Sequence, residues 1–147
     1  MISGKDLYFV AVKLFLRDVD KLLISHDVYG AWDLPGGRIK PDEFDVPLQD
    51  IIARKMREEL GENLRYELED PRIFFRVKRI EQSTDTEVKI FAIGYEANYL
   101  GGDIHLGQSH DTFEWVDIRT FKPGDYFEGG WLKGVEEYLK IDRAAQE

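Results

Sequence analysis

Apolar and polar positions along the chain predict strands interrupted by two helices. Five segments are rich in β-branched and aromatic side chains and predict strands: residues 8–16, 21–25, 73–78, 87–97 and 113–116. The polar segments 17–20 and 82–85 predict the turns of two hairpins. Residues 29–34 then lead into a loop that is marked by two glycines.

The period changes to that of a helix at residues 47–60, where the apolar positions form one stripe: Leu48, Ile51, Ile52 and Met56. Pro47 suits the first turn of this helix, with Asp45 or Val46 near the cap, and Gly61 suits its C-terminal stop. A second helix is predicted at residues 131–141, with its own apolar face. Strands on both sides of the first helix and a helix at the end predict an α/β fold, in which helices cover two faces of a mixed sheet.

Composition narrows the classes of protein to which the chain can belong. A chain of 147 residues fits one domain, 1–147, and 43% hydrophobic residues support a real core. The net charge of -9 argues against an extended nucleic-acid partner, although bound cations could still attract a small anionic substrate. No apolar run is long enough to span a membrane, and residues 1–6 do not resemble a signal peptide. The chain has no cysteine, which excludes thiol chemistry, and we expect a cytoplasmic location.

Charged side chains gather on one face of the first predicted helix. Lys55, Glu58, Glu59 and Glu62 follow helical spacing and therefore share a face. Their carboxylates repel one another, and a divalent cation such as Mg²⁺ would remove that repulsion. The alternative is a solvated charged face that is held by Arg54–Glu58 and Lys55–Glu59 pairs.

Two adjacent glycines precede this helix and change its interpretation. Gly36 and Gly37 allow backbone angles that other residues avoid, so a carbonyl of the loop could turn towards the helix and complete a metal site. The alternative is an ordinary tight turn. Four aromatic residues could contact a substrate, but aromatic residues in strands usually pack in the core: Tyr29, Trp32, Phe74 and Phe91.

The glycines, the acidic residue after them and the charged helix together resemble the Nudix box of the Nudix hydrolases. Five residues separate Gly37 from Glu43, as in the family, and Arg54, Met56 and the Glu58–Glu59 pair fit the second half of the box. The segments 32–37 and 110–116 are also similar to family segments. The resemblance implies an α/β/α sandwich and metal-dependent hydrolysis of a diphosphate bond in a nucleoside diphosphate-linked compound.

The same resemblance implies roles for individual residues. Glu58 and Glu59 would bind Mg²⁺ (or Mn²⁺), with the backbone carbonyl of Gly37 as a further ligand. Glu43 and Arg54 would support the loop and the helix, with Gly36 as a further structural support of the motif. Apart from the resemblance, we expect Trp32, Arg38 and Lys55 to contact a small nucleotide-type substrate. No membrane partner is expected, and a homodimer is common in the family.

The chain departs from the family pattern at three places. Ten residues instead of seven separate Glu43 from Arg54, Glu62 stands where an apolar residue is usual, and Lys55 replaces the first glutamate of the helix. Lys55 could bind a substrate phosphate, or it could pair with Glu59 and switch the site off.

In the family, that first glutamate is often a metal ligand or the general base, so another group would have to serve as the base here. We expect Glu114 first, and then Glu62, Asp111 and His110, although His110 is also interpreted as an exposed loop residue. Two other functions stay open. The chain could be a catalytically silent Nudix domain that binds a nucleotide or a partner protein, or a structural protein whose acidic helix is only a soluble face.

Overall fold

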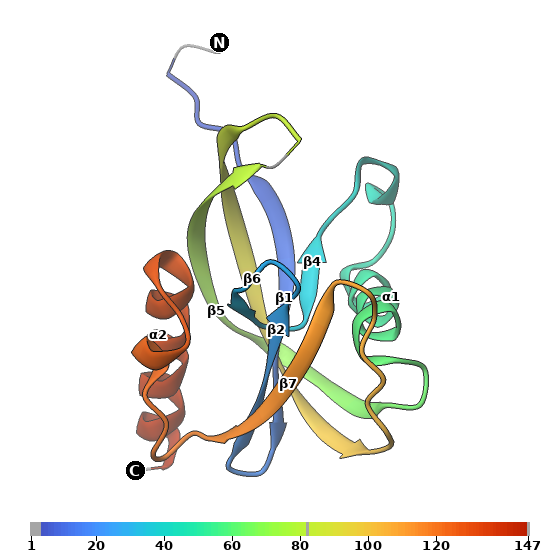
Figure 1. Cartoon of the computed structure of the whole chain (residues 1–147), viewed down its shortest axis with the longest axis vertical. Coiled ribbons are helices and arrows are strands. Elements are labelled where there is room, and N and C mark those ends of the chain that lie inside the picture. Colours follow the sequence, from blue (N-terminus) through green and yellow to red (C-terminus); the bar gives the residue numbers. More distant parts are fainter. Residues whose placement is uncertain (1–3, 82, 147) are drawn as a thin grey trace.

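A mixed sheet lies between two helices in the computed structural model, which describes residues 4–81 and 83–146 (Figure 1). The strands are β1 (Phe9–Asp18), β2 (Lys21–Asp27), β3 (Trp32–Asp33), β4 (Gly36–Arg38), β5 (Arg65–Glu81), β6 (Thr86–Gly101) and β7 (His110–Asp117). The helices are α1 (Leu48–Leu60) and α2 (Gly129–Gln146), with two 3-10 turns, η1 (Pro41–Glu43) and η2 (Pro123–Asp125). Gln82 of the expected turn and residues 1–3 of the N-terminal segment lie outside the described residues.

The strand order brings the glycine segment to the centre of the sheet. The main path of the sheet is β3-β2-β1-β6-β5, with β4 also paired to β1 and β7 paired to β2. β1 and β6 are parallel, whereas the other pairs are antiparallel, so the sheet is mixed as predicted. Gly36 and Gly37 lie opposite Lys13 and Val12 of β1, so the predicted glycine loop is in fact a short strand.

Side chains of β1 are buried on both faces of the sheet because a helix covers each face (Figure 1). Ala11 and Phe15 pack in the cluster that contains the apolar side chains of α2, and Val12 and Leu14 pack in the cluster that contains those of α1. Burial on both faces explains why β1 reads as a nearly continuous apolar run. The arrangement is the expected α/β/α sandwich.

β5 is much longer than the predicted strand at 73–78. Its register shifts on both sides of Pro71, where the ladder with β6 is irregular. β5 lies at the edge of the sheet, and an edge strand tolerates a proline at a bulge because one side of its backbone needs no partner strand. The predicted strand at 73–78 lies wholly on the C-terminal side of Pro71, and the part of β5 before it was not predicted.

α1 confirms the predicted helix, with a correction at its start. Pro47 is the N-cap residue and not part of the first turn, and no side chain caps this end. Gly61 ends the helix as predicted, with φ at +93°. A second correction concerns the expectation that aromatic residues of the strands pack in the core. Tyr29, Phe74 and Phe91 are exposed and do not lie in the core.

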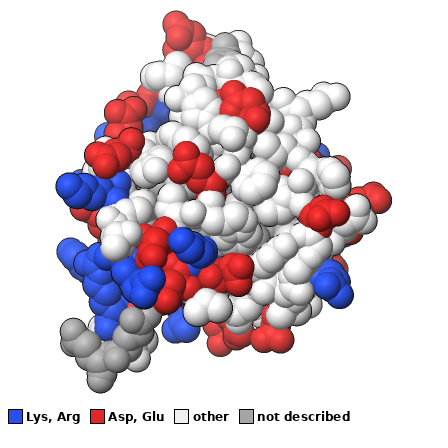
Figure 2. All heavy atoms as spheres, turned by 60° about the horizontal axis from the view of Figure 1, so that its bottom comes forward, with Lys and Arg blue, Asp and Glu red and all other residues white. Residues whose placement is uncertain are grey.

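Charge is unevenly distributed over the surface. On the face shown in Figure 2, acidic side chains are scattered, and basic side chains of the described residues gather mainly at its lower left, without a continuous band across the face. Among the described residues, no helix is both long and apolar enough to cross a membrane.

Candidate active site

The glycine strand β4 approaches β1 more closely than any side chain would allow. A Cβ atom on Gly36 would lie 2.0 Å from the carbonyl oxygen of Val12, and Gly36 has φ at +126°. Both facts require glycine at this position. The backbone N–H of Gly36 donates a hydrogen bond of 3.0 Å to Oε2 of Glu59. The segment is therefore fixed between β1 and the end of α1.

Lys13 lies beneath this segment and was missed in the sequence. Its buried ammonium donates to Oδ1 of Asp33 at 3.0 Å and to the carbonyl oxygens of Leu34 and Gly36 at 3.1 Å each. A buried charge needs such partners, and these three acceptors fix the path of the chain from β3 to β4. The signal in the sequence was a single charged residue inside an apolar strand.

Glu59 projects from α1 into this cluster. Its residue is only 5% exposed, so the alternative of a solvated charged face is wrong for this side chain. Burial raises the pKa of Glu59, and the nearby Asp33 carboxylate adds to the rise. Its second oxygen, Oε1, has no hydrogen-bond partner within the described chain. A buried carboxylate oxygen without a partner is costly, and it indicates a position for a ligand, an ion or water.

His110 completes the cluster, and its interpretation as an exposed loop residue is wrong. It is 8% exposed, begins β7, and its Nε2 lies 3.7 Å from both Oδ2 of Asp33 and Oε1 of Glu59. The contact with Asp33 raises the pKa of His110 against the opposing effect of burial. For Asp33 itself, burial raises the pKa, but the charge of Lys13 and several hydrogen bonds lower it further, so the net shift is downward.

The start of the motif is tied to α1 by Arg54. Its guanidinium donates two hydrogen bonds to Glu43, of 2.8 and 2.7 Å, and one of 3.0 Å to Glu58. Glu43 also accepts the backbone N–H of Lys40 at 3.0 Å. The Arg54–Glu43 hydrogen bonds span the longer segment between η1 and α1. Glu43 and Arg54 therefore stay in contact despite the three additional residues.

Lys55 takes a different partner from the one expected. Its ammonium lies 3.7 Å from Oε2 of Glu58, so the expected Lys55–Glu59 pair is wrong. Hydrogen bonding from Arg54 lowers the pKa of Glu58, and Lys55 adds to the effect. The side chain of Glu58 is 47% exposed, unlike that of Glu59. The two adjacent glutamates therefore have different environments.

A cavity of about 240 Å³ joins these groups. It is lined by Ala11, Lys13, Asp27, Tyr29, Asp33, Gly36, Gly37, Arg38, Lys55, Glu59, Arg79, Ile90, Ser109, His110 and Trp131. Four lining residues are basic and three are acidic, whereas the whole chain has 20 basic and 29 acidic residues. Against the acidic background, this concentration of cations suits an anionic ligand.

A larger cleft of about 880 Å³ shares residues with the cavity and has aromatic walls. Trp32 lies in this cleft, and its ring contacts that of Tyr126 edge-on at 5.2 Å. Trp131 lines both spaces. The expected substrate contacts Trp32 and Arg38 thus lie in adjoining parts of one depression, although Arg38 is also paired with Glu81 at 3.0 Å.

Glu114 lies apart from the cavity. It is exposed on β7 and accepts a hydrogen bond of 3.1 Å from the hydroxyl of Tyr126. Asp111 contacts His26 at 2.8 Å, and Glu62 is exposed. The structure does not bring these three acids into the cavity that Glu59 and His110 line.

The oxygen ligands of the site fit one divalent ion that a substrate helps to coordinate. Within the described part of the chain, no group of three or more His, Asp or Glu side chains could hold a metal ion. Glu59 offers the unpartnered Oε1, but Glu58 already contacts two cations. Mg²⁺ commonly takes one or two carboxylates together with water and substrate phosphates. The residues therefore do not fit a resident cluster of several ions.

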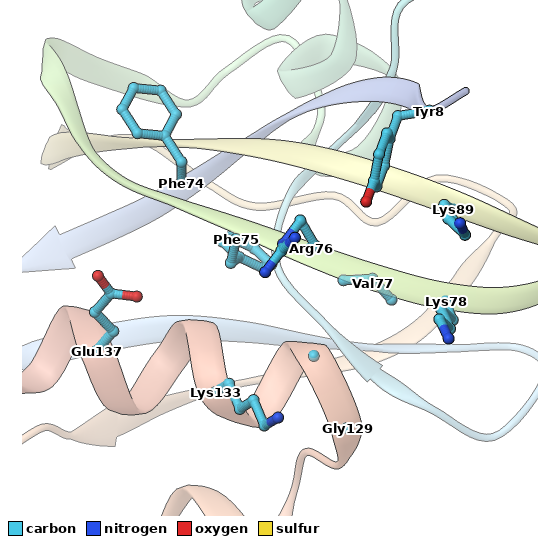
Figure 3. Close-up of a pocket in the computed structure, with 11 residues that line it drawn as sticks. Tyr8, Phe74, Phe75, Arg76, Val77, Lys78, Lys89, Gly129, Lys133 and Glu137 are labelled. Carbon is cyan, nitrogen blue, oxygen red and sulfur yellow. The ribbon is translucent and has the colours of Figure 1, made fainter. Parts of the chain in front are cut away.

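A second groove, of about 640 Å³, lies along β5 and the first turns of α2 (Figure 3). Its lining includes three aromatic and four basic residues: Tyr8, Phe74, Phe75, Arg76, Lys78, Lys89 and Lys133. It contains no residue of β4 or α1. This groove shares no residue with the cavity that Glu59 lines, although it shares Val77, Lys78, Gly129 and Gly130 with the aromatic cleft.

Comparisons with known proteins find relatives of similar sequence and a solved structure of the same fold. The chain is 28% identical over 90 residues to the nucleoside triphosphatase NudI of Escherichia fergusonii, covering 59% of this chain and 62% of that relative. It is 27% identical over 113 residues to the protein of the same name from Enterobacter sp. strain 638, covering 75% and 78%. The MutT protein of Methanosarcina mazei has the same fold, with a TM-score of 0.75, 23% identity and coverage of 99% and 100%. No protein-family model matches the chain.

Substituting the two glycines separately tests the close approach of β4. We expect Gly36→Ala to lower the free energy of unfolding by ~3 kcal/mol or more, because the new Cβ meets backbone at a positive φ. Gly37→Ala meets only the flexible end of Lys55 and should cost less than ~1 kcal/mol. Chemical denaturation of both variants measures the difference, and equal losses would contradict this account.

The buried histidine predicts a pH dependence of stability in the metal-free protein. The pKa of His110 is raised above its ordinary value of 6.5, so its stabilising contribution is full below that pH. The contribution is lost as pH rises through the raised pKa. We expect the difference in Tm between wild type and His110→Gln to shrink from pH 6 to pH 9, measured by thermal denaturation. A difference that grows over this range would show that the pKa is lowered instead.

Proposed function

We propose that this chain, which belongs to the Nudix hydrolase family, hydrolyses a diphosphate bond in a nucleoside diphosphate-linked compound with the help of Mg²⁺ or Mn²⁺. One observation carries the proposal. The buried carboxylate of Glu59 presents an unpartnered oxygen beside a small cavity, and this cavity concentrates basic side chains on an acidic protein. A diphosphate is small, strongly anionic and able to complete the coordination of a divalent ion.

The cavity and its adjoining cleft would bind different parts of such a substrate. Lys55, Arg38 and Arg79 line the cavity, where their positive charge favours phosphate groups. The cleft offers Trp32, Tyr126 and Trp131, whose rings suit stacking against a nucleobase. This division explains why a compound with both a base and a diphosphate suits the site better than either part alone.

Glu59, with Glu58 at its edge, would hold the divalent ion. The ion, when bound, supplies Lewis-acid chemistry that polarises a phosphoryl oxygen and activates water. The residues of the chain prepare its place: Lys13 fixes the path of the glycine segment, and the N–H of Gly36 orients one oxygen of Glu59. The other oxygen is thereby left towards His110 and the cavity.

A catalytically silent nucleotide-binding domain is the second candidate. The observation in its favour is Lys55, which stands where the family has a carboxylate. Its ammonium lies beside Glu58 and neutralises the charge of that side chain. Such a domain would bind a nucleotide in the same cavity and cleft without cleaving it.

Hydrolysis of a nucleotide panel separates the two candidates. Release of phosphate and pyrophosphate is measured first with nucleoside triphosphates, because two relatives are named nucleoside triphosphatases. ADP-ribose, nucleotide sugars and dinucleoside polyphosphates follow. Each compound is tested with Mg²⁺, Mn²⁺ or EDTA. We expect metal-dependent turnover in wild type and a loss of about 100-fold or more in Glu59→Gln, because the amide is a weaker ligand.

Glu62→Gln is the matched control, since it makes the same change on an exposed residue of the same segment. It should keep turnover within about threefold of wild type. Turnover that survives in Glu59→Gln would refute the role of Glu59, and a folded wild type without turnover on any compound would favour the silent domain.

A further inference from the structure

Lys55 occupies a place that exists only because residue 37 is glycine. A Cβ atom on Gly37 would lie 2.3 Å from Cε and 2.7 Å from Nζ of Lys55. The lysine side chain thus lies directly over the backbone of the glycine strand, on the wall of the cavity that Glu59 also lines. A residue with any side chain at position 37 would force Lys55 to move.

The ammonium of Lys55 keeps its hydrogen-bonding capacity although it is largely sheltered. Its side chain is 21% exposed, and within the described chain its contact is the ion pair of 3.7 Å with Glu58, too long for a hydrogen bond. The other cations of the cavity differ. Lys13 donates three hydrogen bonds, and Arg38 is paired with Glu81 and lies 4.8 Å from the ring of Phe9. Arg79, the fourth basic residue of the cavity, is exposed on β5 and is not sheltered. Lys55 is therefore the sheltered cation that is best able to donate to a ligand.

We propose that the Lys55 ammonium binds a phosphate group of the substrate directly and takes the place of one divalent ion. A carboxylate at this position would face Glu58 one turn away and would need a metal ion to offset the repulsion. The ammonium instead neutralises Glu58 and leaves donors for a phosphate oxygen. The inference rests on the proposed function only for the class of ligand, a nucleoside diphosphate, and not on its hydrolysis.

Metal-free binding of a non-hydrolysable diphosphate tests this assignment. The probe is α,β-methylene-ADP in EDTA, titrated by isothermal calorimetry. We expect measurable binding to wild type and a loss of about tenfold or more in Lys55→Gln, because a charge-assisted hydrogen bond is removed. Lys55→Arg should stay within about threefold of wild type, since it keeps the charge and the donors.

Two further variants control for net charge and for position. Lys140→Gln removes the same charge from an exposed residue of α2 and should leave binding unchanged. Gly37→Ala keeps the charge but displaces the Lys55 side chain, and it should weaken metal-free binding as well. Circular dichroism confirms that each variant is folded.

The affinity for Mn²⁺ alone gives an independent measurement, by electron paramagnetic resonance. Lys55→Glu should bind Mn²⁺ about tenfold more tightly than wild type, because it adds a carboxylate ligand beside Glu58. Unchanged Mn²⁺ affinity in this variant, unchanged metal-free nucleotide binding in Lys55→Gln, or no metal-free binding to wild type would each overturn the inference.

The outcomes also separate this inference from the proposed function. A wild type that binds the analogue through Lys55 but hydrolyses nothing would refute the hydrolase and support the inference. A wild type that hydrolyses nucleotides, while Lys55→Gln binds the analogue as well as wild type does, would refute the inference alone.

Discussion

A lysine buried inside a sheet needs acceptors for all three of its N–H groups, and Lys13 finds them in Asp33, Leu34 and Gly36. Those contacts bind β1 to the segment that carries β3 and β4, and they hold the glycine backbone where its N–H reaches Glu59. Asp33, fixed by the same ammonium, contacts His110 in turn. The positions of the buried acidic groups at the cavity thus depend on one internal cation.

The distribution of charge gives the cavity its chemistry. The chain as a whole carries a net charge of -9, yet the cavity gathers more basic than acidic side chains. Cations close to a partly enclosed space attract phosphate strongly because the field is less screened than at the surface. The aromatic cleft beside the cavity adds a surface for a flat ring system. A nucleotide satisfies both parts.

Local patterns in the sequence predicted much of the fold. The apolar stripe and Gly61 indicated α1, and the spacing from Gly37 to Glu43 indicated the motif. Features that depend on long-range pairing could not be predicted in this way. His110 looks like a loop residue until β7 pairs with β2 and places its ring between Asp33 and Glu59.

Long-range packing also decides the environments of the charged residues of α1 and β1. Helical spacing put Glu58 and Glu59 on one face, but only the packing of α1 against the sheet decides that Glu59 is buried and Glu58 is not. Lys13 appeared as one charged residue in an apolar strand, and its acceptors come from residues 33–36, which lie beyond β2 in the chain. The part of β5 before Pro71 was not predicted, because a proline fits a strand only at a sheet edge or a bulge, and the edge position of β5 depends on long-range pairing.

A crystal structure with Mn²⁺ and α,β-methylene-ADP, in which anomalous scattering locates the ion, tests most directly whether the cavity binds a diphosphate. We expect phosphate groups in the cavity between Gly37, Lys55 and Glu59, one Mn²⁺ beside Glu59, and the base in the cleft of Trp32. Phosphates in the groove of Arg76 and Lys133, with no ion near Glu59, would contradict it (Figure 3).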